Sequence, residues 1–232
     1  APELIEEIYT RYTKVGANLI STNTFGVMPW VLDEYGLATQ SYEIAKAGAK
    51  SARAVCDQFQ SDDEPRFVLG SLGPGTKLPS LGHIDYDEMF AGYKESALGL
   101  IDGGCDIFLL ETCQDPLQIK AALHGCEAAN EERKVKLPIM VSATIELSGT
   151  MLIGTDAATL ATILEPFDLL SLGLNCGTGP DQVKKHLKKL SELSSFPLSI
   201  HANAGLPQNR GGYTYYPMGP DEFTEKQLEF TE

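Results

Sequence analysis

Short apolar runs alternate with longer segments of helical periodicity along the chain, and this rhythm restricts the possible folds more than any other feature. The expected strands are residues 17–21, 66–71, 105–110, 137–144, 168–174 and 196–201. The expected helices are residues 1–16, 37–59, 85–101, 116–130, 156–164 and 181–193, with a loop at 208–217 and a further helical start near 222. Strands that are apolar throughout suit a parallel sheet covered on both faces by helices. The sequence therefore predicts an α/β fold.

Two architectures fit this rhythm, a (β/α)8 TIM barrel and an open doubly wound sheet. A doubly wound sheet that binds a dinucleotide would carry a Gly-x-Gly-x-x-Gly fingerprint, and the sequence has none. We therefore favour the barrel, although six strands are fewer than the eight that close one. The chain also begins inside an expected helix, without an initiator Met, and stops inside another. We expect residues 1–232 to form one barrel domain that is truncated, with its first and last strands missing.

The composition narrows the class of partner. The chain has 32 acidic and 18 basic residues, which gives a net charge of -14. Nucleic acids and anionic membrane surfaces are bound through basic patches, so neither is an expected partner. The apolar runs are too short to cross a bilayer. Five cysteines are an odd number without the spacing of a disulfide framework, which favours a reduced, cytoplasmic location.

Polar side chains stand where the expected strands end. They are Thr22, Asn23, Glu111, Thr112, Thr144, Asn175, Cys176, His201 and Asn203. In a barrel, the carboxyl ends of the strands form the face that carries the active site. The sequence thus predicts a functional site built from these strand ends.

Cys176 is the strongest candidate among these residues. It follows an apolar strand and Asn175, and it precedes a Gly-Thr-Gly-Pro turn that begins a helix. A thiolate at this place is a suitable ligand for zinc, and zinc can in turn activate a thiol substrate. The alternative is a cysteine used only for packing, as free cysteines usually are. Packing is the better interpretation of Cys56, Cys105 and Cys126.

Three other strand-end residues have both a structural and a functional interpretation. Glu111 ends an apolar strand, where a carboxylate is costly unless it is paired, so it either forms a salt bridge or binds the ammonium group of an amino-acid substrate. Asn23 is either a turn residue or a contact for a substrate carboxylate. His201 has an imidazole that suits zinc, but a lone histidine after an apolar strand is more often a hydrogen-bonded core residue.

Six short motifs occur in order over nearly the whole chain and carry a family resemblance. They are GANLISTNTF (16–25), GSLGP (70–74), GGCDIFLLET (103–112), LPIMVS (137–142), GLNC (173–176) and NAGLP (203–207). In these motifs the sequence resembles the homocysteine-binding domain of the homocysteine S-methyltransferase superfamily. Within that superfamily it is most similar to the amino-terminal modules of cobalamin-dependent methionine synthases.

The resemblance implies a (β/α)8 barrel with a zinc ion held by three cysteines, of which Cys176 matches the first. The other two form an adjacent pair in a Gly-Gly-Cys-Cys-Gly motif that this sequence lacks, as it lacks the first-strand motif of the family. Glu111 matches the glutamate that contacts the substrate amino group, and Asn23 lies in the matching loop. We assign Cys176 as the catalytic and metal-binding residue, and the substrate-binding residues as Asn23, Glu111, Thr144 and Asn175.

The function that the resemblance implies is a zinc-dependent S-methyltransferase module, which activates homocysteine as a zinc thiolate for methyl transfer to give methionine. A free thiol has a pKa near ~8.5, whereas a zinc-bound thiol is deprotonated. The donor would be methylcobalamin, supplied from methyltetrahydrofolate, through the cobalamin and folate modules of a parent chain. With one zinc cysteine of three, we expect this chain alone to bind zinc poorly and to be inactive.

Other interpretations remain open. A betaine- or S-methylmethionine-type homocysteine methyltransferase would use the same barrel with a different donor. An unrelated barrel lyase or isomerase would need a Gly-rich phosphate site, for which Gly211-Gly212 is a weak candidate. An inert folded fragment would leave Cys176 without a ligand.

Overall fold

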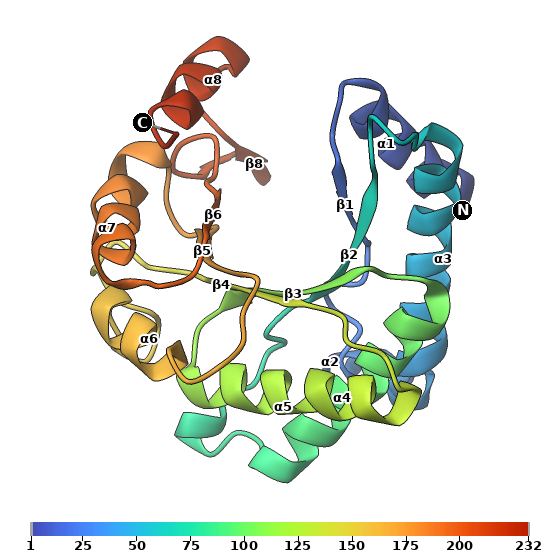
Figure 1. The fold of residues 1–232 in the computed structure, drawn as a ribbon. Helices are drawn as coiled ribbons and strands as arrows, with labels where there is room; N and C mark the ends of the chain where they lie inside the picture. Colours follow the sequence, from blue (N-terminus) through green and yellow to red (C-terminus); the bar gives the residue numbers. More distant parts are fainter. Residues whose placement is uncertain (1, 232) are drawn as a thin grey trace. The chain divides into compact units, whose positions relative to one another are not determined.

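Six strands follow one another in the order of the sequence in one sheet of the computed structural model, which describes residues 2–231 (Figure 1). The strands are β1 (Leu19–Ser21), β2 (Phe67–Leu72), β3 (Ile107–Cys113), β4 (Ile139–Ala143), β5 (Ser171–Asn175) and β6 (Leu198–His201). The pairs β1–β2, β2–β3 and β5–β6 are parallel. A doubly wound sheet reverses its strand order at a switch point, and this sheet does not. The prediction of a parallel α/β fold is confirmed, and the strand order is the one found in barrels.

Helices connect successive strands, as the periodicity predicted. They are α1 (Pro2–Lys14), α2 (Pro29–Leu32), α3 (Ser41–Phe59), α4 (Tyr86–Gly103), α5 (Pro116–Arg133), α6 (Ala157–Leu164), α7 (Pro180–Leu193) and α8 (Pro220–Leu228), with 3-10 turns at Asp33–Tyr35, Ala38–Gln40 and Pro79–Leu81. The short α2 was not predicted, because four residues are too few to show a period. None of the helices in residues 2–231 has the length and hydropathy needed to span a membrane.

The chain divides into two compact units, and the boundaries between them fall within β3, at the start of α5 and within β4. The first unit contains the residues up to Glu111 together with Leu117–Met140. The second contains Thr112–Pro116 and the residues from Val141 onward. Each unit is described by itself below.

The first unit is built around close contact between α3 and α4. A Cβ atom added at Gly99 would lie 2.3 Å from the carbonyl oxygen of Tyr42, and one added at Gly103 would lie 2.5 Å from that of Lys46. Real Cβ atoms do not approach other atoms so closely, so these two positions on α4 accept only glycine. Opposite them, α3 presents fully buried alanines, Ala45 and Ala49. Small residues on both helices thus set their separation.

A polar cluster ties α3, α4 and α5 together in the first unit. Asp102 on α4 accepts hydrogen bonds from Arg133 Nε at 2.9 Å and Nη2 at 2.8 Å, and from the Tyr42 hydroxyl at 2.6 Å. The two parallel N–H···O bonds make this a bidentate pair, the stronger kind of ion pair. The Arg133 guanidinium, followed by the Tyr42 hydroxyl, lowers the pKa of Asp102 from 3.8 to about 2.

The second unit contains α6, α7 and α8 with β5 and β6. A Cβ atom at Gly173 on β5 would lie 2.1 Å from Ser199 Oγ on β6, so glycine is required where these strands meet. Ion pairs attach α8 to α7, with Lys184 Nζ 2.6 Å from Glu229 Oε2 and Lys226 Nζ 2.8 Å from Asp181 Oδ1.

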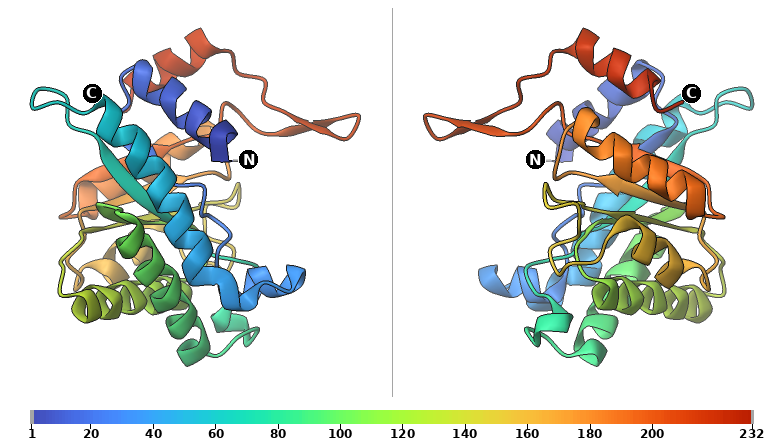
Figure 2. Two further views of the ribbon diagram at one scale, coloured as in Figure 1. Left: turned by 90° about the vertical axis from the view of Figure 1, so that its right-hand side faces the viewer. Right: turned by 90° about the vertical axis from the view of Figure 1, so that its left-hand side faces the viewer.

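The segment 208–217, predicted to be a loop, instead contains a β-hairpin. Its strands are β7 (Gln208–Arg210) and β8 (Tyr213–Tyr215), which pair in antiparallel register. Gly211 and Gly212 both have positive φ, as the tight turns of two-residue hairpins require. A Gly-Gly pair between short polar and aromatic runs is a hairpin signal, so the loop prediction was wrong. The hairpin extends away from the rest of its unit (Figure 2).

We expect Asp102→Asn to lower the free energy of unfolding by about 1 kcal/mol at pH 7, because it removes a partly exposed bidentate ion pair. The folded-state pKa of Asp102 is about 2, below its ordinary value of 3.8. The stabilisation is therefore present above pH ~4 and is lost as the pH falls toward ~2. Urea unfolding of both proteins at pH 7, 5 and 3 measures this.

The control for this experiment is Asp63→Asn, at an exposed aspartate in the acidic turn before β2. It should unfold like the wild-type chain at each pH. A difference between wild type and Asp102→Asn that does not shrink between pH 5 and pH 3 would contradict the role given to the ion pair.

Candidate functional site

At the carboxyl ends of β2 and β3, in the first unit, Ser71 holds the carboxylate of Glu111. The Ser71 hydroxyl donates a hydrogen bond to Glu111 Oε1 over 2.5 Å. Ser71 is itself fixed by the loop after β1, because its N–H donates to Thr22 Oγ1 at 3.0 Å and its carbonyl accepts from Thr24 Oγ1 at 2.7 Å. The end of one strand thus positions the carboxylate at the end of the next.

Glu111 keeps hydrogen-bonding capacity that residues 2–231 do not use. Its side chain is half-buried, and within the described residues it forms no ion pair and accepts no hydrogen bond other than the one from Ser71. The salt bridge considered for Glu111 is therefore not found in this part of the chain. A half-buried carboxylate with one neutral partner is well suited to bind a cationic group, since desolvation makes a charged partner favourable.

Asn23 lies beside Tyr9 in the same unit. The Tyr9 hydroxyl donates to Asn23 Oδ1 at 3.1 Å and accepts from the Asn23 N–H at 2.8 Å. Burial of the phenol raises the pKa of Tyr9, so it stays protonated and can donate this bond. Asn23 is exposed, and its amide Nδ2 makes no hydrogen bond within residues 2–231. The amide group is thus oriented with its N–H donors available to a ligand.

In the second unit, Cys176 directly follows β5 and presents an exposed thiol. The other cysteines, Cys56, Cys105, Cys113 and Cys126, are buried. Cys176 has a φ of 56°, in the left-handed region that residues with a side chain rarely adopt. Such strained conformations persist only where neighbouring contacts hold them, and they cluster at functional sites.

The side chain of Asn175 supplies those contacts. It is 3% exposed, and its Oδ1 accepts hydrogen bonds from the Thr112 N–H at 2.9 Å and the Ser142 hydroxyl at 2.8 Å. Its Nδ2 donates to Thr112 Oγ1 at 2.8 Å and to Cys176 Sγ at 3.3 Å. Both ends of the carboxamide are therefore occupied by protein groups.

Two threonines complete the surroundings of Cys176. Thr112 also has a left-handed φ, of 57°, which is unusual for a β-branched residue. Its Oγ1 lies 3.7 Å from Cys176 Sγ, and because it accepts from Asn175 its own hydrogen is free to point to the sulfur. Thr144 is buried, and its hydroxyl donates to the Asn175 carbonyl at 3.0 Å. Thr112, Thr144 and Asn175 thus act together to position Cys176.

Two predicted strand-end residues make backbone hydrogen bonds with the segment 176–178. The Cys176 N–H donates to the His201 carbonyl at 3.2 Å, and the Asn203 N–H donates to the Thr178 carbonyl at 3.3 Å. The His201 side chain is exposed and that of Asn203 is half-buried. Residues 2–231 contain no group of three or more His, Cys, Asp or Glu side chains that could hold a metal ion. The side chains present therefore do not form a zinc site by themselves.

Three supporting residues were missed by the sequence analysis. Tyr9 fits the apolar face of α1, so nothing in its spacing indicates that its hydroxyl holds a loop. Ser71 and Ser142 lie inside buried strands, where a hydroxyl needs a partner. A serine within an otherwise apolar strand was therefore a signal that could have pointed to both residues.

Comparison with known proteins gives the family. The sequence profile of the homocysteine S-methyltransferase family matches residues 1–232. The chain belongs to the homocysteine S-methyltransferase family. Two relatives are the methionine synthases of Mycobacterium leprae (strain TN), 43% identical over 229 residues, and of Mycobacterium tuberculosis (strain ATCC 25618 / H37Rv), 42% identical over 229 residues. Each alignment covers 99% of this chain and 19% of the relative, so the chain spans about a fifth of their length.

Among solved structures, the chain resembles the homocysteine methyltransferase MmuM from Escherichia coli. The oxidized form has a TM-score of 0.73 and 22% identity, over 87% of this chain and 71% of that chain. The metallated form has a TM-score of 0.73 and 20% identity, over 88% of this chain and 73% of that chain. At this identity the likeness concerns the fold. The family resemblance inferred from the six motifs is confirmed.

We expect Asn175→Ala to lower the free energy of unfolding by about 2 kcal/mol, because it leaves the Thr112 N–H and the buried Ser142 hydroxyl without partners. Urea unfolding measures the loss. The same substitution at the exposed Asn209, in the hairpin of the same unit, serves as a control and should cost less than about 0.5 kcal/mol. Equal unfolding midpoints for the two variants would show that the Asn175 carboxamide does not hold these strand ends.

Proposed function

We propose that this chain is the homocysteine-binding part of a methyltransferase of the methionine synthase type, which transfers a methyl group to the sulfur of homocysteine to give methionine. The family match over residues 1–232 and the identity of 42–43% to two methionine synthases support the reaction class. The observation that carries the proposal for this chain is the Glu111 carboxylate, which is half-buried, held by Ser71 and without a cationic partner in residues 2–231.

The proposed recognition of homocysteine uses its two charged groups. The Glu111 carboxylate would accept N–H bonds from the substrate ammonium group, since charge-assisted bonds to a partly buried carboxylate are strong. The Asn23 amide, turned by Tyr9, would donate to the substrate carboxylate. Thr144 and Asn175, predicted to contact substrate, would act through Cys176, because their polar atoms bond to protein groups.

We also propose that the methyltransferase uses a zinc ion, to which this chain contributes only part of the ligands. Cys176 would supply one sulfur ligand, which suits zinc. Residues 2–231 contain no group of three or more His, Cys, Asp or Glu side chains that could hold a metal ion, so we propose that other residues of a longer protein complete the site. The contribution that we assign to this chain is the binding and orientation of homocysteine.

The methyl donor is part of the same proposal. We propose methylcobalamin, replenished from methyltetrahydrofolate, carried by cobalamin and folate modules of a longer parent chain. The alternative is a betaine- or S-methylmethionine-type enzyme. The identity of 42–43% to two methionine synthases favours the first.

We expect Glu111→Gln to raise the KM for L-homocysteine about tenfold or more, because a charge-assisted bond to the substrate ammonium is lost. Methyl-transfer kinetics of the complete enzyme that contains this chain give the measurement. With 4-mercaptobutanoate, which lacks the ammonium group, wild type and Glu111→Gln should have the same KM for the thiol substrate. Glu131→Gln, at an exposed position on α5, is a control and should leave the KM for L-homocysteine and the KM for 4-mercaptobutanoate unchanged. An unchanged KM in Glu111→Gln would remove the basis of the proposal.

We expect the chain of residues 1–232 alone to bind clearly less than one zinc ion per molecule at micromolar zinc, because one sulfur cannot complete a tetrahedral site. Equilibrium dialysis with metal analysis tests this, with Cys176→Ser as the reference for non-specific binding. Tight, stoichiometric zinc on this chain would show that its own residues complete the site.

A further inference from the structure

Two exposed leucines lie on the loop after β4, in the second unit. Leu147 is 67% exposed and Leu152 is 60% exposed, although Met151 between them is fully buried. The loop is held by its own backbone, because the Met151 N–H donates to the Thr155 carbonyl at 2.7 Å. A buried anchor and a hydrogen-bonded backbone thus present two large apolar side chains to the solvent.

The two leucines line an apolar groove of about 610 Å³. Leu206 and Pro207, from the loop after β6, line it as well, and Gly177 contributes from the turn after β5. Glu146 is the only charged side chain among the described residues that line the groove. The groove is therefore made by the loops that follow three neighbouring strand ends of one unit, and most of its side chains are apolar.

Gly177 places this groove next to Cys176. A Cβ atom at Gly177 would lie 2.9 Å from the carbonyl oxygen of Ile145, so the turn after β5 packs directly on the loop after β4. A Cβ atom at Gly179 would lie 2.9 Å from the Cα atom of Gly205, so the same turn also packs on the loop after β6. The turn that carries the exposed thiol thus lies between the two loops that line the groove.

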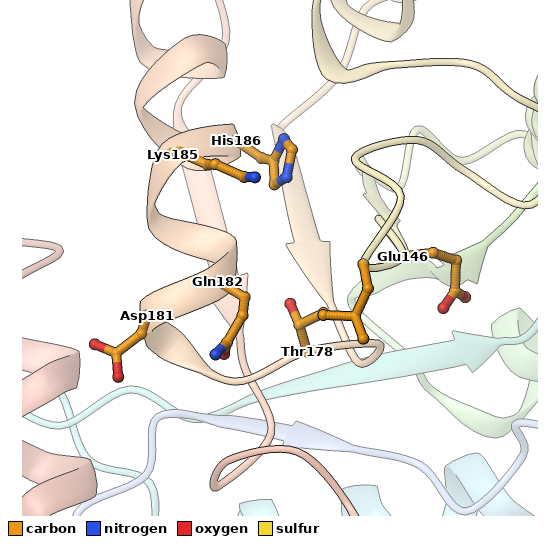
Figure 3. A pocket seen from close by; sticks show the side chains of 7 residues that line it. Glu146, Thr178, Asp181, Gln182, Lys185 and His186 are labelled. Atoms are coloured by element: carbon orange, nitrogen blue, oxygen red, sulfur yellow. The ribbon is translucent and has the colours of Figure 1, made fainter.

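A smaller cavity, of about 270 Å³, lies beside α7 and differs in character (Figure 3). Gln182, Lys185 and His186 line it from the helix, and Figure 3 shows the Glu146 carboxylate turned away from α7. Polar and charged side chains on a helix face are solvated and need no partner. Exposed leucines around a groove do indicate a partner, so the apolar groove is the candidate for binding.

A protein surface suits this groove better than a small molecule does. Binding sites for small molecules bury most of the surface of the ligand. The two leucines of this groove are each at least 60% exposed, so they would enclose little of a small ligand. Exposed apolar patches of this kind are typical of surfaces that another protein covers.

The position of the groove selects the protein. A methyl donor has to bring its methyl group to within about 3–3.5 Å of the substrate sulfur, and we place that sulfur beside Cys176. A carrier of the donor therefore approaches the turn after β5 and meets the groove next to it. The chain spans about a fifth of the methionine synthases that it matches, so other modules of a longer protein can serve as the carrier.

We propose that the groove lined by Leu147, Leu152 and Leu206 is the surface on which the protein module that carries the methyl donor docks. The matching surface of the carrier is apolar, with a hydrogen-bond donor or a basic group opposite Glu146. This inference rests on the proposed methyl transfer to homocysteine, and it adds the surface through which the donor arrives.

Photo-crosslinking in the complete enzyme that contains this chain tests the docking without measuring activity. With p-benzoylphenylalanine in place of Leu152, we expect a crosslink to the module that retains the methyl donor, identified by mass spectrometry. The same photo-reactive residue in place of Leu193 is the matched control, because Leu193 is 50% exposed in the same unit but does not line the groove. It should not crosslink to that module.

Kinetics of the same enzyme give the second readout. Leu147→Asp and Leu152→Asp should each slow methyl transfer from the carried donor about tenfold or more, because a charge opposes an apolar contact. Both should leave the KM for L-homocysteine unchanged, and also the methylation of bound homocysteine by free methyl iodide, which needs no docking. Leu193→Asp should leave all three quantities unchanged, and circular dichroism checks that each variant is folded.

Three results would overturn the docking surface: a normal rate of transfer in both leucine variants, an equal loss of the reaction with methyl iodide, and crosslinks from position 152 only to a second copy of this chain. An enzyme that methylates homocysteine normally in both leucine variants refutes the docking surface alone. A wild-type enzyme that methylates homocysteine from no donor refutes the proposed function.

Discussion

The second unit depends on one buried carboxamide. Asn175 uses its acceptor and its donor to join the ends of β3, β4 and β5, through Thr112, Ser142 and Cys176. Two residues in left-handed conformation, Thr112 and Cys176, lie on either side of it. Strain of this kind costs of order 1–3 kcal/mol per residue and persists only where the surroundings enforce it. The exposed sulfur of Cys176 is therefore a consequence of a hydrogen-bonded strand end, and not of a mobile loop.

The fold could be predicted well because it follows from periodicity. Each of the six apolar runs became a strand, and the absence of a dinucleotide fingerprint correctly favoured the barrel order. The hairpin at Gln208–Tyr215 was missed because its strands are short and exposed on both faces, so no apolar alternation marks them. The 3-10 turn before Ser41 was missed because helical periodicity does not distinguish a 3-10 turn from the first turn of an α-helix.

The candidate site was predictable only in part. Glu111 and Cys176 stand out in the sequence because a charge and a thiol follow apolar strands. The residues that support them do not stand out, since the bond from Ser71 to Glu111 joins residues 40 positions apart, and the bond from Asn175 Nδ2 to Thr112 Oγ1 joins residues 63 apart. Such contacts depend on strand register, which a single sequence does not specify.

The projecting β7–β8 hairpin is part of the covalent connection between α7 and α8. Arg210 stacks over Tyr215 with its guanidinium carbon 3.7 Å from the ring centroid, and the neighbouring Tyr213 is 80% exposed. Exposed turns of this kind are preferred places for proteolytic nicking. A trypsin cut after Arg210 would separate α8 covalently from α7. After such a cut, the contacts of α8 with α7 would be non-covalent, and they include the exposed ion pairs of Lys184 with Glu229 and of Lys226 with Asp181. Exposed pairs of this kind contribute little and are screened by salt, so release of the cleaved segment should become easier as the salt concentration rises.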